Sequence, residues 1–325
     1  MSEVLNRVEK IGIVPVVKIT EIEDALPMAQ ALYNGGIDCM EITFRSEFAL
    51  PGIEIIAKEL PDMLIGAGTV SSVSQAETAI KAGAQFIVTP GFNHDVVKWC
   101  VENDVLVLPG ISTASELETA ISYGLTNVKF FPAESSGGAK KIKDLSAPYA
   151  DITFMPTGGI NAKNMHDYLA LPCINAIGGS FMLPADAIAA KDWDTVERLS
   201  REAVDALLSY ELIHIGFNNN TSEEAKENAE VLCNLFGFKY YGKPKSHFAG
   251  RGFEFLNSVG RGEHGHFGIY TPYPERALYQ LEKKGIHVVE DTITRNKKTN
   301  KINFAYLDKE IAGFAIHLIN PDVKM

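Results

Sequence analysis

Short runs of apolar and β-branched residues alternate with longer amphipathic segments through the first two thirds of the chain, about every 20 to 25 residues. Eight of these runs are predicted to be strands: Ile11–Val17, Ile37–Thr43, Met63–Gly66, Gln85–Thr89, Val105–Pro109, Asn127–Phe131, Ile152–Pro156 and Cys173–Gly178. The segments between them are predicted to be helices, for example Glu23–Tyr33, Val73–Ala82 and Ser115–Tyr123. Glycine stands at the expected C-caps of several helices, at Gly35, Gly83 and Gly124.

This alternation predicts βα units around a parallel sheet. Eight units within about 200 residues fit a (β/α)8 TIM barrel better than an open, doubly wound sheet. The active site of such a barrel lies where the strands end, and the predicted ends here are rich in glycine, proline and polar residues. They are Gly66–Thr69, Thr89–Gly91, Pro109–Ser112, Lys129–Glu134, Pro156–Ile160 and Ile177–Ser180. Each alone would pass as an ordinary turn, but together on one face they predict a site.

Lys129 is the most informative residue, because it lies inside the apolar run Asn127–Phe131. A buried ammonium costs free energy unless it is paired or used. Burial favours the neutral amine of a lysine, and a neutral amine can attack a ketone to form a Schiff base. A snorkelling or ion-paired lysine is the structural alternative. Glu41, in another strand-like run, is the candidate acid–base partner, or else the other half of a plain ion pair.

Further polar residues extend this candidate site. Arg45 follows Glu41 by four positions, and its planar guanidinium can hold a carboxylate. Thr69 would add a hydroxyl donor. Lys18 is a rival lysine after the first strand, and we expect it to be solvated. The pairs Gly158-Gly159 and Gly178-Gly179, with Ser180, would offer backbone amides ahead of helices to a phosphate.

Composition and charge limit the classes of protein that fit. The 325 residues suit one large domain and one small one. No apolar run reaches the roughly 20 residues of a membrane helix. Four scattered cysteines without a CxxC pair, and no signal-peptide pattern, predict a cytoplasmic protein. The net charge of −11 argues against binding to nucleic acid or to an anionic membrane.

The charge also changes along the chain, which predicts two domains, 1–210 and 211–325. Residues 1–210 hold 15 Lys+Arg and 27 Asp+Glu, whereas residues 211–325 hold 15 and 14. Six of the eight histidines lie in the second part. Its predicted strands are Glu211–Phe217, Gly252–Leu256, His266–Tyr270, Gly285–Val288, Ile302–Leu307 and Gly313–Ile319, and its predicted helices are Ser222–Phe236 and Pro274–Lys284. These elements form two successive βαβ-type halves.

Residues from about 8 to 208 resemble the bacterial 2-dehydro-3-deoxy-phosphogluconate (KDPG) aldolases, some of which also act on 4-hydroxy-2-oxoglutarate (KHG). The matching segments are Val14–Val16, Met40–Arg45, Gly66–Val70, Pro109–Thr113, Lys129–Glu134, Pro156–Ile160 and Ile177–Ser180. Phe181, which is tryptophan in some relatives, is a small departure. The resemblance implies a cytoplasmic class I aldolase without metal or other cofactor, usually a homotrimer, whose partners are a phosphorylated 2-keto acid and pyruvate.

The same resemblance implies roles for individual residues. Lys129 would be the Schiff-base lysine and Glu41 the acid–base carboxylate. The remaining substrate-binding positions are Arg45 and Thr69 for the pyruvyl carboxylate, Pro90 and Phe131 as lining, and Thr157, Gly158, Gly159, Gly179 and Ser180 for the phosphate. The reaction would cleave KDPG to pyruvate and glyceraldehyde 3-phosphate, or KHG to pyruvate and glyoxylate. The galactonate-derived epimer stays open as a substrate, and a phosphate-binding barrel isomerase or epimerase is the alternative enzyme.

Residues 211–325 resemble the vicinal oxygen chelate, or glyoxalase-like, fold, a smaller α+β domain. In that fold the positions of metal ligands correspond to His214, Glu254, His266 and His317. Imidazole and carboxylate donors suit zinc, nickel or iron. His317 is a departure, because the family often has glutamate there. Two hypotheses therefore stand for this segment: a metal-dependent glyoxalase-like enzyme, or a binding and assembly module without metal.

Overall fold

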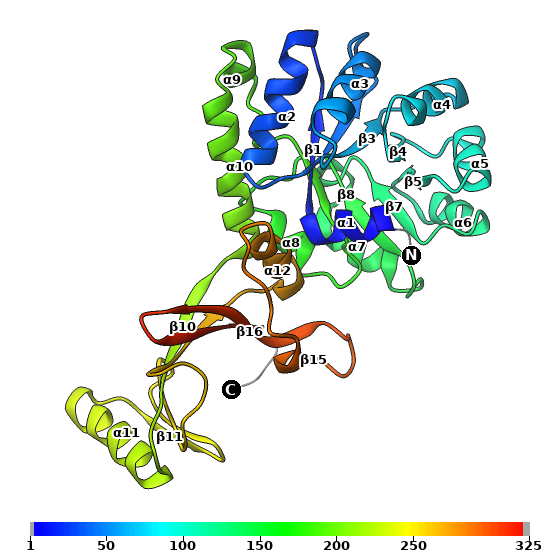
Figure 1. Ribbon diagram of the computed structural model, residues 1–325. Helices are drawn as coiled ribbons and strands as arrows, with labels where there is room; N and C mark the ends of the chain where they lie inside the picture. Colours follow the sequence, from blue (N-terminus) through cyan, green and yellow to red (C-terminus); the bar gives the residue numbers. More distant parts are fainter. Residues whose placement is uncertain (1–2, 321–325) are drawn as a thin grey trace. The chain divides into compact units, whose positions relative to one another are not determined.

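A computed structural model describes residues 3–320 of the chain (Figure 1). The chain divides into two compact units, Met1–Leu207 and Leu208–Met325. Among the described residues, no helix combines the length and the apolar character needed to cross a bilayer. Each unit is built around its own sheet, so each is described by itself below.

Strands and helices alternate through the first unit, and its helices lie on the outer side of the strands (Figure 1). The strands are β1 (Ile13–Val17), β2 (Cys39–Thr43), β3 (Leu64–Gly68), β4 (Phe86–Val88), β5 (Leu106–Leu108), β6 (Gly110–Ile111), β7 (Asn127–Phe130), β8 (Thr153–Pro156) and β9 (Ile177–Gly179). The helices are α1 (Glu3–Ile11), α2 (Ala25–Asn34), α3 (Ala49–Glu59), α4 (Val73–Lys81), α5 (His94–Glu102), α6 (Ala114–Ser122), α7 (Gly138–Ser146), α8 (Met165–Leu169), α9 (Ala185–Ala189) and α10 (Trp193–Leu208).

The strands form a curled parallel sheet, which confirms the predicted α/β class. Six strands are hydrogen-bonded in the order β5-β4-β3-β2-β1-β9, and three more in the order β6-β7-β8. The bridges Phe154↔Ile174 and Thr157↔Gly178 connect the β8 segment to the β9 segment. All strand pairs of this unit are parallel, and the strands are buried on both faces, as parallel strands under helices usually are.

Local chemistry explains where several elements begin and end. Thr113 and Glu116 form a capping box at the start of α6, so two helix-end amides have side-chain partners. Gly83 and Gly124 adopt the positive φ expected after a helix. At the end of α2, Gly35 is the C-cap as predicted, with φ −72°, and the next residue, Gly36, takes the positive φ.

The first predicted strand also begins too early. Ile11 is the last residue of α1, whose buried residues Leu5, Val8 and Ile11 lie three apart on one helix face. Gly12, with φ 78°, separates this helix from β1. The apolar run therefore continues across a helix end and a strand start, and an unbroken apolar run cannot show that boundary.

The second unit repeats one arrangement twice: a strand, a helix and three further strands. The first half is β10 (Glu211–Phe217), α11 (Ser222–Phe236), β11 (Tyr240–Lys243), β12 (Ser246–Ala249) and β13 (Phe253–Leu256). The second half is β14 (Gly265–Tyr270), α12 (Pro274–Glu282), β15 (Thr294–Arg295), β16 (Ile302–Ile311) and β17 (Phe314–Ile319). The predicted strand at residues 285–288 is wrong, since only Val288 makes an isolated bridge there.

Symmetry between the halves places the first and last strand of each at the centre of the sheet. The order is β11-β12-β13-β10-β14-β17-β16-β15. Strands β10 and β13 are parallel, β14 and β17 are parallel, and β10 meets β14 antiparallel. Side chains on these four central strands can therefore meet on one face of the sheet.

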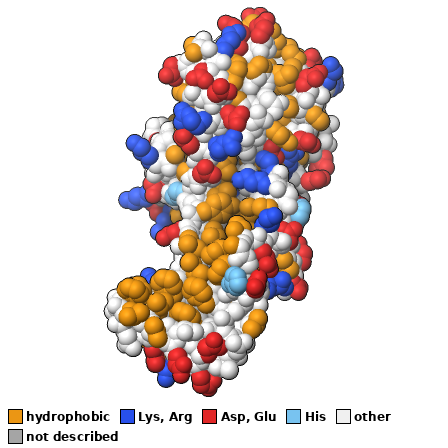
Figure 2. Space-filling model, turned by 60° about the vertical axis from the view of Figure 1, so that its left-hand side comes forward, with side chains coloured by type: hydrophobic (Ala, Val, Ile, Leu, Met, Phe, Trp, Pro, Cys, Tyr) orange, Lys and Arg blue, Asp and Glu red, His pale blue; other side chains and the backbone are white. Residues whose placement is uncertain are grey.

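Helix α11 covers the first half of this sheet through two alanines. Ala225 and Ala229 are fully buried and pack with Phe255 and its apolar neighbours. The last turn of the helix is different, because Leu235 and Phe236 are about two-thirds exposed. Figure 2 shows hydrophobic side chains gathered on part of the surface.

Candidate functional site

The strands of the first unit bring Lys129 and Glu41 together, although they lie 88 positions apart in the chain. Lys129 is on β7 and Glu41 is on β2, and both are almost fully buried. The Lys129 ammonium nitrogen Nζ lies 3.1 Å from Glu41 Oε1 and 3.2 Å from Oε2. The pair is therefore close enough to exchange a proton directly.

Gly68, on the neighbouring strand β3, has no side chain, and the carboxylate of Glu41 fills the space where one would lie. A Cβ atom at Gly68 would lie 2.2 Å from Glu41 Oε1 and 2.5 Å from its Cγ. No real Cβ makes contacts that short, so any larger residue would displace the carboxylate. The sequence indicates Gly68 only as a turn residue at a strand end.

The residues expected to hold a carboxylate lie after β2 and β3. Arg45 is exposed, and its Nε donates to Thr43 Oγ1 over 3.1 Å. Thr43 is buried and donates in turn to the Val17 carbonyl over 2.7 Å. Thr43 is a positioning residue that sequence reasoning missed. Thr69 has φ 58°, an uncommon conformation for a non-glycine residue and one worth noting beside a site.

Phe131 and Pro90 were expected to line the site, and both are exposed. Lys129 Nζ lies 5.4 Å from the centre of the Phe131 ring, within the range of a cation–π contact. The peptide bond between Phe131 and Pro132 is cis. Lys18, the rival lysine, is exposed as predicted.

One of the segments expected to hold phosphate is tied to the end of β7 by backbone hydrogen bonds. The amides of Ala133 and Glu134, after β7, donate to the carbonyls of Thr157 and Gly158 over 2.8 Å and 3.1 Å. Gly158 and Gly159 both have positive φ, at 106° and 79°. Glycine is the residue that adopts such angles without strain.

Thr157 and the end of β9 complete this part of the site. Thr157 is buried, and its Oγ1 has no hydrogen-bond partner among residues 3–320. Gly178 lies opposite, where a Cβ would stand 2.2 Å from Thr157 Oγ1, while Gly179 is buried and Ser180 exposed. The expected helix N-termini are not at the glycines, because α8 begins at Met165 and α9 at Ala185. An anion here would therefore be held by loop groups.

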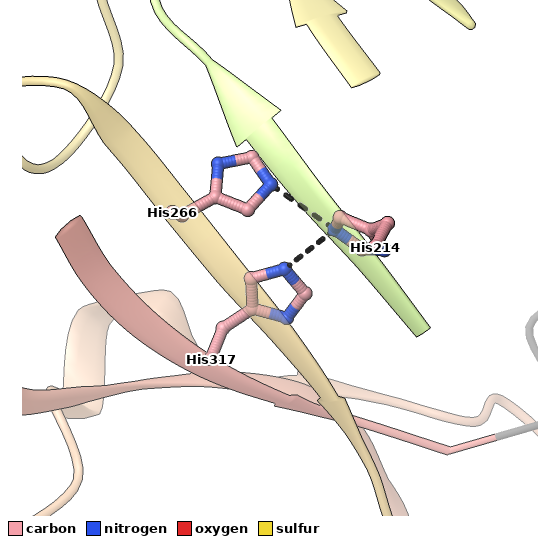
Figure 3. A group of neighbouring side chains, drawn as sticks. All are labelled: His214, His266 and His317. Carbon is pink, nitrogen blue, oxygen red and sulfur yellow. Dashed lines mark hydrogen bonds between the residues drawn. The ribbon is translucent and has the colours of Figure 1, made fainter. Parts of the chain in front are cut away.

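In the second unit, three histidines from three central strands converge (Figure 3). His214 Nε2 lies 3.1 Å from His266 Nε2 and 3.1 Å from His317 Nε2. Glu254, on the fourth central strand, completes the group: its Oε2 is 3.5 Å from His214 Nε2 and 3.3 Å from His266 Nε2. All four residues that the sequence indicated as possible metal ligands thus lie together.

For three of these four side chains, the surroundings favour the protonation state in which they bind a metal. Burial lowers the pKa of His214 to about 4 and that of His317 to about 2. Burial alone would raise the pKa of Glu254, but hydrogen bonds from His266 and Ser246 hold it below its usual value. Neutral imidazole and ionised carboxylate are the metal-binding forms of these residues.

The distances also fit a cation. Donor atoms of a four-coordinate site with bonds of about 2.0–2.1 Å lie about 3.3–3.4 Å apart, and the four donor distances above are 3.1–3.5 Å. The three histidine Nδ1 atoms have no protein partner within the described part of the chain, so protein groups do not set their tautomers.

Three small residues support the cluster, and sequence reasoning missed them. Gly268 lies opposite His214 and Gly216 opposite His266 in the antiparallel pair. A Cβ at either glycine would stand 2.2 Å from the imidazole Cε1 facing it. Ser246 is buried and donates to Glu254 Oε1 over 2.6 Å, which orients the carboxylate. Glycines opposite histidines in neighbouring strands are the signal that would have found two of these residues.

Comparison with known proteins gives a consistent result for the first unit. The family model of KDPG and KHG aldolases matches residues 4–199. A 2-dehydro-3-deoxy-phosphogluconate aldolase of Treponema pallidum (strain Nichols) is 46% identical over 204 residues, 63% of this chain and 97% of the relative. A KHG/KDPG aldolase of Escherichia coli (strain K12) is 45% identical over 59% of this chain and 91% of the relative.

A solved structure is similar as well. The KDPG aldolase of Legionella pneumophila, crystallised with pyruvate captured at low pH as a covalent carbinolamine intermediate, has a TM-score of 0.60 and 36% identity. It covers 62% of this chain and 98% of its own. The likeness shows an aldolase-type α/β fold with a curled parallel sheet.

Proposed function

Because the chain belongs to the KDPG and KHG aldolase family, we propose that Lys129 and Glu41 carry out its reaction. The chain is a class I aldehyde-lyase that cleaves KDPG to pyruvate and glyceraldehyde 3-phosphate, and we extend this to cleavage of KHG to pyruvate and glyoxylate. The observation that carries the roles is the buried contact of Lys129 Nζ with both oxygens of Glu41. The isomerase alternative is not favoured, because the matched relatives are aldolases.

The contact gives a direct route for the protons of the reaction. Glu41 takes a proton from Lys129, whose amine attacks the C2 ketone of the substrate. The carbinolamine then loses water, and Glu41 supplies the proton for the departing hydroxyl. Glu41, again a carboxylate, accepts the proton of the substrate's C4 hydroxyl, and the iminium accepts the electron pair of the breaking C3–C4 bond, so the aldehyde leaves. The enamine that remains is protonated and hydrolysed to pyruvate, which frees Lys129.

Other residues would bind the two ends of the substrate. Arg45 and Thr69 hold the carboxylate of the pyruvyl part, and Pro90 and Phe131 line its position. The phosphate is held by the group formed by Thr157, Gly158, Gly159, Gly179 and Ser180. The buried Thr157 hydroxyl, which lacks a partner in the described chain, supports this assignment. The parallel strands and bridges support closure of the sheet into a (β/α)8 barrel, and family membership supports a homotrimer.

Borohydride reduction in the presence of pyruvate tests the proposed lysine. Peptide mass spectrometry should find a reduced pyruvyl adduct on Lys129, and Lys129→Ala should carry none. Lys18→Ala is the matched control, since Lys18 is exposed and should not affect trapping. An adduct that persists in Lys129→Ala would contradict the assignment.

For the second unit we infer a glyoxalase-like domain with a metal centre. His214, Glu254, His266 and His317 would hold the ion, and their convergence carries this inference. A bound divalent ion would supply Lewis-acid polarisation of a ligand oxygen. Ser246 holds Glu254 in place, and the glycines opposite the histidines leave room for the rings.

Metal analysis of the purified full-length chain tests the centre. We expect about one zinc, nickel, cobalt or iron per chain after loading and desalting, and none in a His214→Ala/His266→Ala variant. Substitution of His247, a histidine of the same unit outside the cluster, is the control. Equal metal content in wild type and in the double variant would leave the second unit as a binding or assembly module.

A further inference from the structure

We propose that the metal centre of the second unit takes a small carboxylate as its ligand, with Arg261 as the side chain that receives it. This proposal rests on the metal centre inferred above, and concerns what binds there. Its basis is the charge of the four donors and of the cations that surround them.

The donor set leaves a divalent ion incompletely neutralised. Three of the four donors are neutral imidazoles, so Glu254 is the only one that brings a negative charge. A glutamate at position 317 would have cancelled the remaining positive charge of a bound divalent ion. All three histidines are at least 95% buried, where an uncompensated charge interacts strongly with its surroundings. A ligand would bind as a fifth group, an expansion that zinc sites sometimes show, and an anionic ligand would bind this centre more favourably than a neutral one.

The surrounding side chains reinforce that preference. Lys243 Nζ lies 4.5 Å from the centre of the Phe248 ring. Phe248 is paired with Glu254 across β12 and β13, which places both side chains on one face of the sheet.

Arg261 approaches from the other half of the sheet. Its guanidinium carbon lies 5.5 Å from the centre of the Tyr306 ring. That ring in turn lies 5.3 Å from the ring of His317 and 6.2 Å from that of His266, between centres. A single side chain, Tyr306, thus contacts both Arg261 and the two candidate metal ligands His266 and His317.

Arg261 is also free to change partner. Its guanidinium forms an ion pair with Asp291 at 3.4 Å, and the two side chains are 46% and 77% exposed. Such exposed pairs contribute little to stability. The planar guanidinium matches a carboxylate with two hydrogen bonds. These observations favour a ligand with a carboxylate group over a neutral carbonyl compound.

Cobalt-loaded protein gives a test that does not depend on activity. The full-length chain carrying Lys129→Ala, which removes Schiff-base formation, is loaded with Co²⁺ and titrated with oxamate, a small carboxylate. We expect a saturable change in the visible absorption of the bound Co²⁺. The uncharged ethyl ester of oxamate should give none at the same concentrations.

Two variants test which side chains are responsible for the binding of oxamate. His317→Glu should keep Co²⁺ and lose at least about tenfold in oxamate affinity, because the added carboxylate neutralises the centre. Arg261→Gln should weaken oxamate binding while leaving Co²⁺ binding unchanged. Arg251→Gln, an exposed arginine of the same unit, is the matched control and should behave as the parent.

The outcomes separate this proposal from the one on which it rests. If Co²⁺ does not bind, the metal centre itself is wrong. If Co²⁺ binds but oxamate and its ester act alike, or Arg261→Gln binds oxamate as well as the Arg251→Gln control, the centre stands and the carboxylate proposal is overturned. Should His317→Glu lose Co²⁺ as well, the comparison of oxamate with its ester still decides.

Discussion

At the scale of single residues, the first unit depends on one buried ion pair. Lys129 and Glu41 are both buried, and removal of either would leave the other as an unpaired buried charge, which is strongly destabilising. The same proximity would let the carboxylate act as the proposed acid–base group for the amine. A substitution of either residue is therefore expected to change both the stability of the fold and the proposed proton transfer.

Glu41→Gln separates these effects in part, because glutamine keeps the shape and loses the proton transfer. We expect kcat to fall by about 10²- to 10⁴-fold, the usual contribution of a general acid–base. KM for KDPG should change much less, since Arg45 and the phosphate group are untouched. Steady-state kinetics with circular dichroism as a folding check measures this. A kcat within threefold of wild type would remove Glu41 from the mechanism.

At the scale of elements, neighbouring strands supply the space that the functional side chains need. Gly68 on β3 faces Glu41, Gly178 on β9 faces Thr157, and Gly268 on β14 faces His214. In each case a Cβ would stand 2.2 Å from the nearest atom of that side chain. A functional residue in these sheets therefore comes with a glycine on the adjacent strand.

Gly68→Ala should displace Glu41 and so lower both stability and kcat. We expect a loss of about 1–3 kcal/mol in the free energy of unfolding, as for other overpacked cores. Gly91→Ala is the control, because nothing lies within 4 Å of a Cβ there, and its stability should stay within about 0.5 kcal/mol of wild type. Chemical denaturation compares the two, and equal stabilities would contradict the packing argument.

Gly268→Ala applies the same argument to the second unit. The added methyl would push His214 away from the other donors, so metal affinity should fall by about 10-fold or more. Gly252→Ala, where a Cβ meets nothing within 4 Å, should bind metal as the wild type does. Calorimetric titration with Zn²⁺ measures both variants. Unchanged affinity in Gly268→Ala would argue against His214 as a ligand.

At the scale of the whole molecule, two units with different chemistry share one chain. The lysine chemistry proposed for the first unit would need no metal, whereas the second unit has donors for one. The buried residues of each unit form a core of its own, as expected of domains that can fold separately. Removal of metal should therefore affect only one of the two.

A chelator tests this independence. We expect EDTA to leave the cleavage of KDPG unchanged and to lower the unfolding temperature of the second unit alone. At a metal concentration of 100 times Kd, the stabilisation that is lost amounts to about 2.7 kcal/mol. Calorimetry of the loaded and stripped full-length chain should show one transition move and the other stay. Loss of aldolase activity on chelation would contradict the assignment of a class I mechanism.

The sequence could predict much of the fold, because its patterns are local. Glu211–Phe217 and Ser222–Phe236 were predicted to the residue, since apolar periodicity and a terminal glycine mark their ends. Strands β11 and β12 were missed. The residues of β11 are partly or fully exposed, and β12 is a short strand of mixed polar and apolar residues. What makes both of them strands is their pairing with each other and the pairing of β12 with β13.

By itself, the sequence determined the class of enzyme through its resemblance to the KDPG and KHG aldolases. It also marked the residues to examine, because an ammonium within an apolar strand and glycines at strand ends are visible as patterns. Only the tertiary structure decided which of those residues meet. The contact of Lys129 with Glu41, and the meeting of four metal-type donors from four strands, depend on strand order and register. The same holds for the supporting residues Thr43, Gly68 and Ser246. Gly68 leaves space for a neighbouring side chain, and Thr43 and Ser246 orient one. Such a role can be recognised only when the position of the neighbour is known.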